Sequence, residues 1–321
     1  MSALVGAILA AGRGTRMRPF SDSTPKPAFP ICNRPLIAYQ IDMMRSLGIE
    51  DVVVLVGHRG FEITRILGDG AEFGVRLRYV EQTQMLGIAH AVGCLEPHID
   101  QPFLLFLGDI FFVARDLAEM PRLLAEQGGG AVLATKLEPD REAIRHNFSV
   151  VLNERGFVTR VVEKPRHPAS RLKGVGLYLF DVAIFDAVRR TPRTAMRDEY
   201  ELTDSIQVLI DDGQPVRVAS VVDEDVNVTT PDDLLEVNLR YAKSVPAAQL
   251  IGAGCRIHPG ATIENSVLGR NVVVQHPISI RDSLLLDDTV VASRTSLERV
   301  VMTPSGQVAC SDPAAAANRD E

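Results

Sequence analysis

Residues 5–35 constrain the fold more than any other stretch of the chain. An apolar run over residues 5–10 leads into a loop in which Gly12 and Gly14 alternate with basic residues, and Lys26 stands between two prolines. A short, uninterrupted apolar run is typical of a buried parallel strand. The glycines let backbone N–H groups approach a ligand, and arginine side chains favour a forked anion such as phosphate. The stretch therefore predicts a strand that leads into a phosphate-binding loop.

Basic residues and prolines define the rest of this stretch. The arginines of the loop are Arg13, Arg16 and Arg18. Pro25 and Pro27 restrict the backbone on both sides of Lys26 and favour extended conformations, so we expect the lysine to act as a fixed point charge. The dinucleotide fingerprint is excluded because Met17 occupies the position of its third glycine, and the P-loop is excluded because no Gly-Lys-Ser/Thr is present. For an isolated Gly-x-Gly, a surface loop with solvated arginines is the alternative.

The composition is that of a globular protein with an acidic balance. The chain has 321 residues, enough for one large and one smaller domain, with 46% hydrophobic and 23% charged residues. The net charge of −7 argues against a nucleic-acid binder, so bound phosphates would need a local group of cations and a metal ion. We expect no membrane segment and no signal peptide, because the apolar N-terminal residues lack a basic leader. The scattered cysteines favour a reducing cytoplasm.

Strand-like and helix-like segments alternate through the first half of the chain. Strands are expected at residues 5–10, 52–56, 77–80, 103–107 and 131–135. Helices are expected at residues 36–47, 61–67, 88–94 and 117–125. Such alternation favours a doubly wound α/β fold with a mixed, mainly parallel, Rossmann-like sheet. Ligands of such sheets bind beyond the carboxyl ends of the strands, where the glycine-arginine loop begins.

Polar residues follow several of these strands. A carboxamide beside a glycine, as at Gln82 and Gly87, can read the edge of a base, although a polar loop before a helix is the alternative. Asp109 follows a central strand, which suits a magnesium ligand or, alternatively, the N-cap of a following helix. In the Glu163-Lys164 pair, the carboxylate can accept two hydroxyls and the ammonium can pair with a phosphate. A solvated ion pair on a turn is the alternative there.

The central region is richer in strands. They are expected at residues 148–152, 157–162 and 174–180, with charged loops at 139–147 and 165–173. We interpret this region as an insertion on one side of the ligand cleft. Farther on, a helix is expected to open at residues 199–204, and Pro231 suits the first turn of another helix behind a threonine cap.

A short repeat follows near the C-terminus. Ile251, Ile257 and Ile263 are six residues apart, and each begins a similar segment. This spacing resembles the hexapeptide repeat of left-handed β-helices and predicts about three coils over residues 245–303. The remaining residues, 304–321, are expected to form a disordered tail.

Taken whole, the N-terminal stretch resembles the signature of the sugar-1-phosphate nucleotidylyltransferases, which is a strand followed by G-x-G-T-R-[LM]-x-P and then, about ten residues on, P-K. Residues 12–19 and then Pro25-Lys26 match this signature. With its repeat, the chain is most similar to long-form glucose-1-phosphate thymidylyltransferases, which carry a C-terminal left-handed β-helix. The resemblance implies a nucleotidyltransferase catalytic domain over residues 1–244. It also implies that an NTP (dTTP or UTP favoured) and a sugar 1-phosphate (glucose 1-phosphate favoured) give an NDP-sugar and pyrophosphate.

The resemblance also implies roles for individual residues. Catalysis would rest on Arg16, Lys26 and Asp109. The nucleotide would be bound by Ala10, Ala11, Gly12, Gly14, Thr15, Arg16, Gln82 and Gly87. The sugar phosphate would be bound by Ser149, Glu163, Lys164 and Gly176. Magnesium would be bound by Asp109 and Asn227. We expect a cytoplasmic homo-oligomer, because exposed β-helix ends favour self-association, and no nucleic-acid or membrane partner.

Three positions depart from the family pattern. Residues 110–112 replace a common asparagine, Ser149 replaces a glycine that approaches the sugar, and Asn227 stands where thymidylyltransferases have aspartate. Uridylyltransferases acting on N-acetylglucosamine phosphate have asparagine there, and an amide oxygen still coordinates magnesium. Two alternatives are kept. One is an acyltransferase, for which the β-helix is short and offers only His258 and His276. The other is a non-catalytic regulatory homologue that binds a nucleotide-sugar and a partner.

Overall fold

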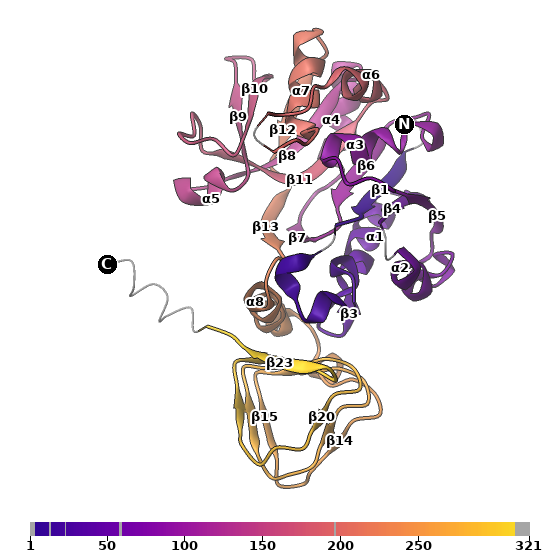
Figure 1. Cartoon of the computed structure of the whole chain (residues 1–321). Helices are drawn as coiled ribbons and strands as arrows, with labels where there is room; N and C mark the ends of the chain where they lie inside the picture. The colour runs from indigo at the N-terminus through magenta and orange to yellow at the C-terminus, as the bar shows by residue number, and fades with distance from the viewer. Residues whose placement is uncertain (1–3, 13, 23, 58–59, 196, 312–321) are drawn as a thin grey trace. The chain divides into compact units, whose positions relative to one another are not determined.

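The computed structural model describes residues 4–311 except residues 13, 23, 58–59 and 196. The chain forms two compact units, which we call unit 1 (Met1–Gly12 and Ala38–Asp225) and unit 2 (Arg13–Ile37 and Val226–Glu321). Unit 1 contains the large sheet and unit 2 contains the repeat (Figure 1). In the described part of the chain, no helix combines the length and the hydropathy needed to cross a membrane.

Unit 1 is built on a sheet of nine strands within the described residues. Its main path runs β10-β9-β11-β6-β1-β4-β5, with β8 beside β11 and β12 beside β8. The strands are β1 (Val5–Ala10), β4 (Asp51–Val56), β5 (Arg76–Glu81), β6 (Phe103–Leu107), β8 (Ala131–Leu137), β9 (Phe148–Leu152), β10 (Val158–Glu163), β11 (Leu172–Phe180) and β12 (Val216–Ala219). Strands β5, β4, β1 and β6 are parallel, whereas β11 runs antiparallel to β6. This confirms the mixed, mainly parallel α/β sheet expected from the sequence.

The register aligns the carboxyl ends of the central strands. Ala10 of β1 lies opposite Val56 of β4, and Leu9 lies opposite Leu107 of β6. The segments after these strands therefore begin at one edge of the sheet, which is where ligands bind in open α/β folds. They include the glycine loop after β1 and the turn that contains Asp109 after β6.

Helices cover this sheet, and not all of them were predicted. They are α1 (Leu36–Ser46), α2 (Gly60–Leu67), α3 (Ile88–Gly93), α4 (Glu119–Gln127), α5 (Arg141–Arg145), α6 (Ala183–Arg190) and α7 (Leu202–Asp211). The first four match the expected helices. Helix α5 lies in the segment 139–147 that we expected to be a loop, and its cap is local, since Asp140 accepts a hydrogen bond from the Glu142 N–H at 2.8 Å. Helix α6 was missed, although Phe185 stacks on Phe103 of β6 with ring centroids 5.3 Å apart.

Gly174 of β11 gives a stability prediction. A Cβ at this position would lie 1.7 Å from Cζ of Phe148, whose buried ring stacks on Tyr178 with centroids 6.1 Å apart. We expect Gly174→Ala to lower the free energy of unfolding by about 1–3 kcal/mol, because the ring must move within a packed core. Gly306→Ala is the matched control, since no atom lies within 4 Å of a Cβ there. Chemical denaturation of both variants measures the effect, and equal stabilities would contradict the packing argument.

In unit 2, residues 13–37 join the C-terminal part because a short hairpin is fixed to a helix. The hairpin strands are β2 (Pro30–Ile31) and β3 (Arg34–Pro35), and the helix is α8 (Pro231–Tyr241). The fully buried Asn238 accepts a hydrogen bond from the Cys32 N–H at 2.7 Å and donates one to the Pro30 carbonyl at 3.0 Å. Helix α8 begins with Pro231 behind the cap residue Thr230, as predicted, and Asp233 completes a capping box with Thr230.

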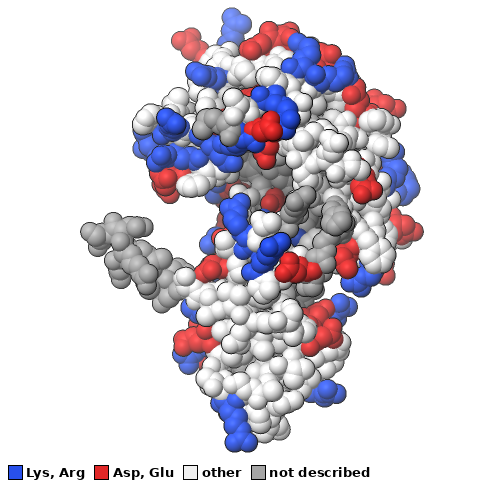
Figure 2. All heavy atoms as spheres, in the orientation of Figure 1, with Lys and Arg blue, Asp and Glu red and all other residues white. Residues whose placement is uncertain are grey.

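The C-terminal part of unit 2 is a short parallel β-helix with a triangular outline (Figure 1). Its faces stack β14 (Arg256–Ile257), β17 (Val273–Val274) and β20 (Val290–Val291); β15 (Thr262–Glu264), β18 (Ser279–Arg281) and β21 (Leu297–Glu298); and β16 (Val267–Leu268), β19 (Leu284–Leu285) and β22 (Val300–Thr303). This confirms the expected three coils. On the face shown in Figure 2, the surface of the β-helix is mostly uncharged. Acidic and basic side chains are interspersed over the same face of unit 1.

The coils repeat every 17 residues, one fewer than three hexapeptides would give. Asn271 Nδ2, for example, donates to Asp288 Oδ1, 17 residues on, at 3.0 Å. Both residues turn a corner with left-handed φ angles of 58° and 61°. Asparagine and aspartate adopt that conformation more readily than most residues. The shortened, Asn/Asp-cornered coil explains why the hexapeptide pattern is irregular after its first segments.

The expectation of a disordered tail from residue 304 is wrong for residues 304–311. Strand β23 (Gly306–Ala309) turns back and pairs antiparallel with β22, with Val301 opposite Val308. The hairpin occupies the edge on which a further coil would stack, and covering such an edge limits uncontrolled strand pairing. The expected tail at 312–321 lies outside the described residues.

Candidate active site

The loop after β1 leaves the sheet at the predicted nucleotide-binding residues. Ala10, the last residue of β1, is buried, whereas Gly12 is exposed. The loop continues into a short 3-10 helix, η1 (Thr15–Met17), in which Thr15 and Arg16 are exposed. Backbone N–H groups at the start of so short a helix have no intrahelical partner. The exposed face of this loop can therefore offer both a guanidinium and backbone donors to an anion.

Gly14 and Lys26 of unit 2 pack against each other. Gly14 has a left-handed φ of 63°, and a Cβ there would lie 2.9 Å from Cγ of Lys26. Glycine is therefore favoured here for two reasons: it adopts the positive φ of the turn, and it leaves room for the aliphatic part of the lysine side chain. Lys26 is only 7% exposed. The structure thus brings together two of the predicted site residues and holds the lysine stem in place.

Other basic residues of the stretch 5–35 are not buried as Lys26 is. Arg18 pairs with Asp22 at 3.4 Å, and both side chains are mostly exposed. Arg13 lies outside the described residues.

The backbone of Lys26 differs from the extended form that we expected. It begins a 3-10 turn, η3 (Lys26–Ala28), which closes because the Ala28 N–H donates to the Pro25 carbonyl at 2.9 Å.

Gln82 directly follows β5, and Gly87 is the N-cap residue of α3, both in unit 1. Gln82 is 4% exposed, and its Nε2 lies 3.0 Å from His90 Nδ1. Gly87 has a φ of 108°, and a Cβ there would lie 2.5 Å from the Tyr200 carbonyl oxygen. The glycine is therefore required by the close approach of the Tyr200 backbone. His90 and Tyr200 were not predicted from the sequence.

Asp109 lies in a tight turn between β6 and β7 (Ile110–Ala114), half-buried. A strand rather than a helix follows it, so the alternative interpretation as an N-cap is wrong. The fully buried Gln40 of α1 fixes this turn, because its Nε2 donates to the carbonyls of Leu107 and Ile110, each at 2.9 Å. Gln40 was not predicted from the sequence, because its large sequence separation from the turn leaves no local signal.

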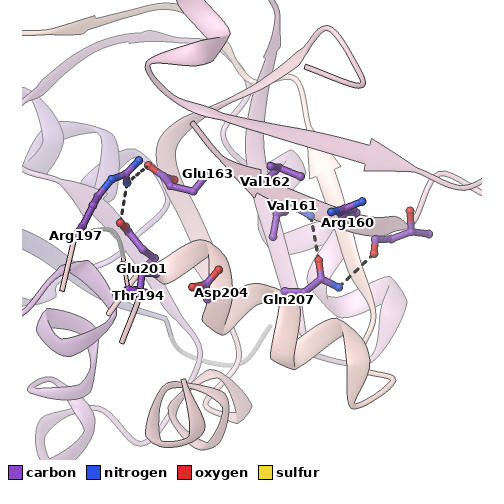
Figure 3. Close-up of a pocket in the computed structure, with 11 residues that line it drawn as sticks. Arg160, Val161, Val162, Glu163, Thr194, Arg197, Glu201, Asp204 and Gln207 are labelled. Atoms are coloured by element: carbon purple, nitrogen blue, oxygen red, sulfur yellow. Dashed lines mark hydrogen bonds and ion pairs between the residues drawn. The ribbon is translucent and has the colours of Figure 1, made fainter. Parts of the chain in front are cut away.

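Glu163, the last residue of β10, lines a pocket of about 540 Å³ (Figure 3), and Lys164 follows it in the chain. Lys164 Nζ is 3.7 Å from a Glu163 carboxylate oxygen. Arg197 was not predicted, yet it points at both Glu163, at 3.6 Å, and Glu201, at 2.7 Å. Burial and the Glu201 charge raise the pKa of Glu163, and the two cations and a hydrogen bond from Thr203 only partly oppose this. Two cations and two carboxylates therefore lie together here, a combination that can bind both phosphate and hydroxyl groups.

The other predicted sugar and metal residues have varied surroundings. Ser149 of β9 is fully buried, and its hydroxyl has no hydrogen-bond partner among the described residues. Gly176 of β11 has a φ of 79°, and a Cβ there would lie 2.5 Å from Ile110 Cδ1. Asn227 is the exposed last residue of β13 (Val222–Asn227), which pairs with β7. It is in unit 2, whereas Asp109 is in unit 1.

The raised pKa of Glu163 predicts how a neutral variant behaves. A carboxyl group with a raised pKa in the folded state binds protons more readily than in the unfolded state, so its contribution to stability is lost as the pH rises through that pKa. Because glutamine does not titrate, we expect Glu163→Gln to have a higher Tm than wild type at neutral pH. That difference should shrink as the pH falls below about 4, the ordinary range of a glutamate. Thermal melting from pH 3.5 to 8 measures it.

Glu142→Gln is the matched control, because Glu142 is exposed and pairs with Arg145 one helical turn away. We expect little pH-dependent change there, since exposed pairs contribute little. A Glu163→Gln variant that is less stable than wild type at neutral pH would contradict the assignment of burial as the dominant cause.

The pattern of the nucleotidyl transferase family matches residues 5–244, and that of the GlmU-like C-terminal hexapeptide matches residues 239–311. The first match covers most of the chain, so this chain belongs to the nucleotidyl transferase family. Together with the signature loop, this makes it an enzyme of the sugar-1-phosphate nucleotidyltransferase type.

Individual relatives agree with this assignment. The low-salt glycan biosynthesis nucleotidyltransferase of Haloferax volcanii is 34% identical, over 73% of this chain and 64% of that protein. The glucose-1-phosphate thymidylyltransferase of Streptomyces griseus is 33% identical, over 92% of this chain and 80% of its own length. A UTP–glucose-1-phosphate uridylyltransferase of Haloferax volcanii is 33% identical, over 75% of this chain and 98% of that protein. A crystal structure of UDP-glucose pyrophosphorylase with UDP-glucose shares the fold, with a TM-score of 0.67 at 23% identity over 76% of this chain and 100% of that one.

Proposed function

We propose that this chain transfers a nucleotidyl group from dTTP or UTP to glucose 1-phosphate, giving NDP-glucose and pyrophosphate. The observation that carries the proposal is the buried Lys26 packed on Gly14, in the loop that matches the family signature. Both bases are kept because relatives of each kind act on glucose 1-phosphate. The reaction is one in-line displacement, in which a phosphate oxygen of the sugar phosphate bonds to the α-phosphorus as the bond to pyrophosphate breaks. Positioning and charge neutralisation drive such a step.

In this proposal each charged residue has its own role in binding the substrates or in stabilising charge during the transfer. Arg16 and the backbone of the glycine loop bind the triphosphate and the departing pyrophosphate. Lys26 stabilises the negative charge that develops at the α-phosphate. Lys164 anchors the incoming phosphate, with Arg197 as a second cation beside it, and Glu163 accepts hydrogen bonds from sugar hydroxyls.

We propose Mg²⁺ as the metal, bound by the Asp109 carboxylate and the Asn227 amide oxygen. These donors fit, because hard oxygens are the ligands that Mg²⁺ prefers. The described residues contain no group of three or more His, Cys, Asp or Glu side chains that could hold a metal. The remaining ligands would therefore be substrate phosphates and water, which is usual for this ion. When bound, it would neutralise phosphate charge.

Pyrophosphate release tests the proposal directly. The protein with Mg²⁺ is assayed with dTTP, UTP, CTP, GTP and ATP, each against glucose, N-acetylglucosamine, mannose and galactose 1-phosphates. We expect the highest rates with dTTP or UTP and glucose 1-phosphate. Silence of the folded protein across the grid, combined with tight binding of a nucleotide-sugar in calorimetry, would favour a regulatory homologue instead.

A further inference from the structure

Charged side chains are gathered inside unit 1 near the end of β13. Lys136 of β8, Lys173 of β11 and Glu138, which directly follows β8, surround Asp225 of β13. Lys173 Nζ donates to Asp225 Oδ2 at 2.7 Å, and Lys136 Nζ donates to Asp225 Oδ1 at 3.0 Å. The side chains of Asp225 and Lys173 are only 3% and 7% exposed. Charges removed from water in this way are stable only when their partners are held in place. We call these four residues the buried ion group.

The register of the large sheet determines where the carboxylate of Asp225 must lie. Lys136 and Lys173 are directly opposite each other on neighbouring antiparallel strands, and like charges in that relation repel. Glu138 lies farther from both ammonium groups, at 3.9 Å from Lys136 and 3.8 Å from Lys173. Asp225 is therefore the principal counter-ion of both lysines, with one carboxylate oxygen for each.

Strand β13 reaches the buried ion group from outside the large sheet. Within the part of the chain that the structure describes, β13 pairs with β7 and not with β8 or β11. At the start of β13, the Arg115 N–H donates to the Val221 carbonyl at 2.9 Å, and the Arg115 guanidinium pairs with Asp223 at 2.9 Å. That ion pair is well exposed and contributes little. The buried ion group is therefore the stronger of these two side-chain attachments, and it holds the end of the strand.

We infer that Lys173 and Lys136 are positioning residues for Asn227, through their hold on Asp225. The inference rests on the proposed function, in which Asn227 is a ligand of Mg²⁺. Asn227 is two residues after Asp225 on β13, and residues two apart in a strand share a face. The side chain of Asn227 is exposed, so packing does little to fix it. An amide oxygen also lacks the charge that draws a cation to aspartate, so its contribution depends on being held in place.

Three single variants test the inference. Lys173→Met removes the ammonium group and keeps an unbranched side chain of similar length. Asn227→Ala removes the proposed ligand itself and sets the scale of the effect. Arg115→Met is the matched control, because it removes the same charge from an aspartate partner on the same strand, at an exposed position. Pyrophosphate release gives the Mg²⁺ concentration for half-maximal rate and the KM for glucose 1-phosphate. A second readout needs no turnover: the rise in Tm that Mg²⁺ adds to the protein saturated with dTTP or UTP.

We expect Lys173→Met to raise the Mg²⁺ concentration for half-maximal rate about tenfold, which is the lower end of the effect of losing a group that orients a metal ligand. The rise in Tm with Mg²⁺ should become smaller, as it should in Asn227→Ala. The KM for glucose 1-phosphate should stay within about twofold, because its binding residues are untouched. Arg115→Met should match the wild type in every readout. An unchanged Mg²⁺ requirement in Lys173→Met would overturn the inference.

The double variant Lys173→Met/Asp225→Leu separates positioning from stability. Replacing both members of a buried ion pair by apolar side chains commonly restores the stability that is lost when one member is removed. We therefore expect its Tm without Mg²⁺ to recover toward the wild-type value while the Mg²⁺ requirement stays raised. Recovery of both would show that the pair acts through stability alone, against the inference. If Lys173→Met does not fold, the double variant decides by the same criterion.

Failure of the proposed function would be recognised separately. Wild-type turnover that needs no Mg²⁺, or a wild-type Mg²⁺ requirement in Asn227→Ala, would remove Asn227 from the metal site and the inference with it. A raised requirement in Asn227→Ala combined with a wild-type requirement in both Lys173 variants would leave the proposed function in place and overturn the inference alone.

Discussion

We expect Lys26→Met to lower kcat by about 10²–10³-fold while the protein remains folded. Loss of one preorganised charge at a developing negative charge costs this much in comparable sites. Methionine keeps the length and most of the volume of the stem that lies against Gly14, so the packing is preserved. Steady-state pyrophosphate release, with the Tm measured in parallel, tests the expectation.

Lys243→Met is the matched control for this variant. Lys243 is an exposed lysine in the same unit, in the short 3-10 helix η6 (Ala242–Ser244) that follows α8, and it undergoes the same loss of charge. A general effect of net charge would slow both variants alike, whereas a role at the α-phosphate affects only Lys26→Met. Near-normal turnover in Lys26→Met would remove this lysine from the mechanism.

The sequence predicted the parts of the fold whose signals are local. The apolar run of β1 and the threonine-proline start of α8 lie within a few residues of what they determine, and both were confirmed. The β-helix was also predictable, because its repeat recurs along the chain. The β23 hairpin was missed because residues 304–311 lack the apolar run that is typical of a strand. Strand β23 is stabilised by its pairing with β22, which the sequence of 304–311 alone does not indicate.

The parts that could not be predicted depend on contacts between distant residues. Asn238 accepts from the backbone of Cys32, 206 residues away, and this is why the N-terminal hairpin belongs to unit 2. Gln40 and Arg197 in the candidate site are similar cases. Glutamine in a helix and arginine in a charged loop are common, and only the fold shows that one fixes the Asp109 turn and the other faces Glu163.

The second large effect is expected at Asp109. We expect Asp109→Asn to lower kcat by about 10²-fold or more and to raise the Mg²⁺ concentration needed for half-maximal rate. The amide keeps the shape of the side chain and one hard oxygen, but it removes the negative charge that a divalent ion needs when few protein ligands are present. The turn itself should persist, because Gln40 holds it through the carbonyls of Leu107 and Ile110, not through the carboxylate. Pyrophosphate release across a Mg²⁺ titration measures both quantities.

Asp223→Asn separates this effect from a general loss of acidic charge. Asp223 lies on β13 of the same unit and pairs with Arg115 at 2.9 Å, but both side chains are well exposed. Such a pair contributes little to stability and has no metal role in the proposal. We therefore expect wild-type rates and an unchanged Mg²⁺ titration in the control. If Asp109→Asn also kept the wild-type Mg²⁺ requirement while its rate fell, Asp109 would act by positioning the substrate and the metal would have to be bound elsewhere. If neither quantity changed, the turn after β6 would have no part in the chemistry, and its fixation by Gln40 would serve the fold alone.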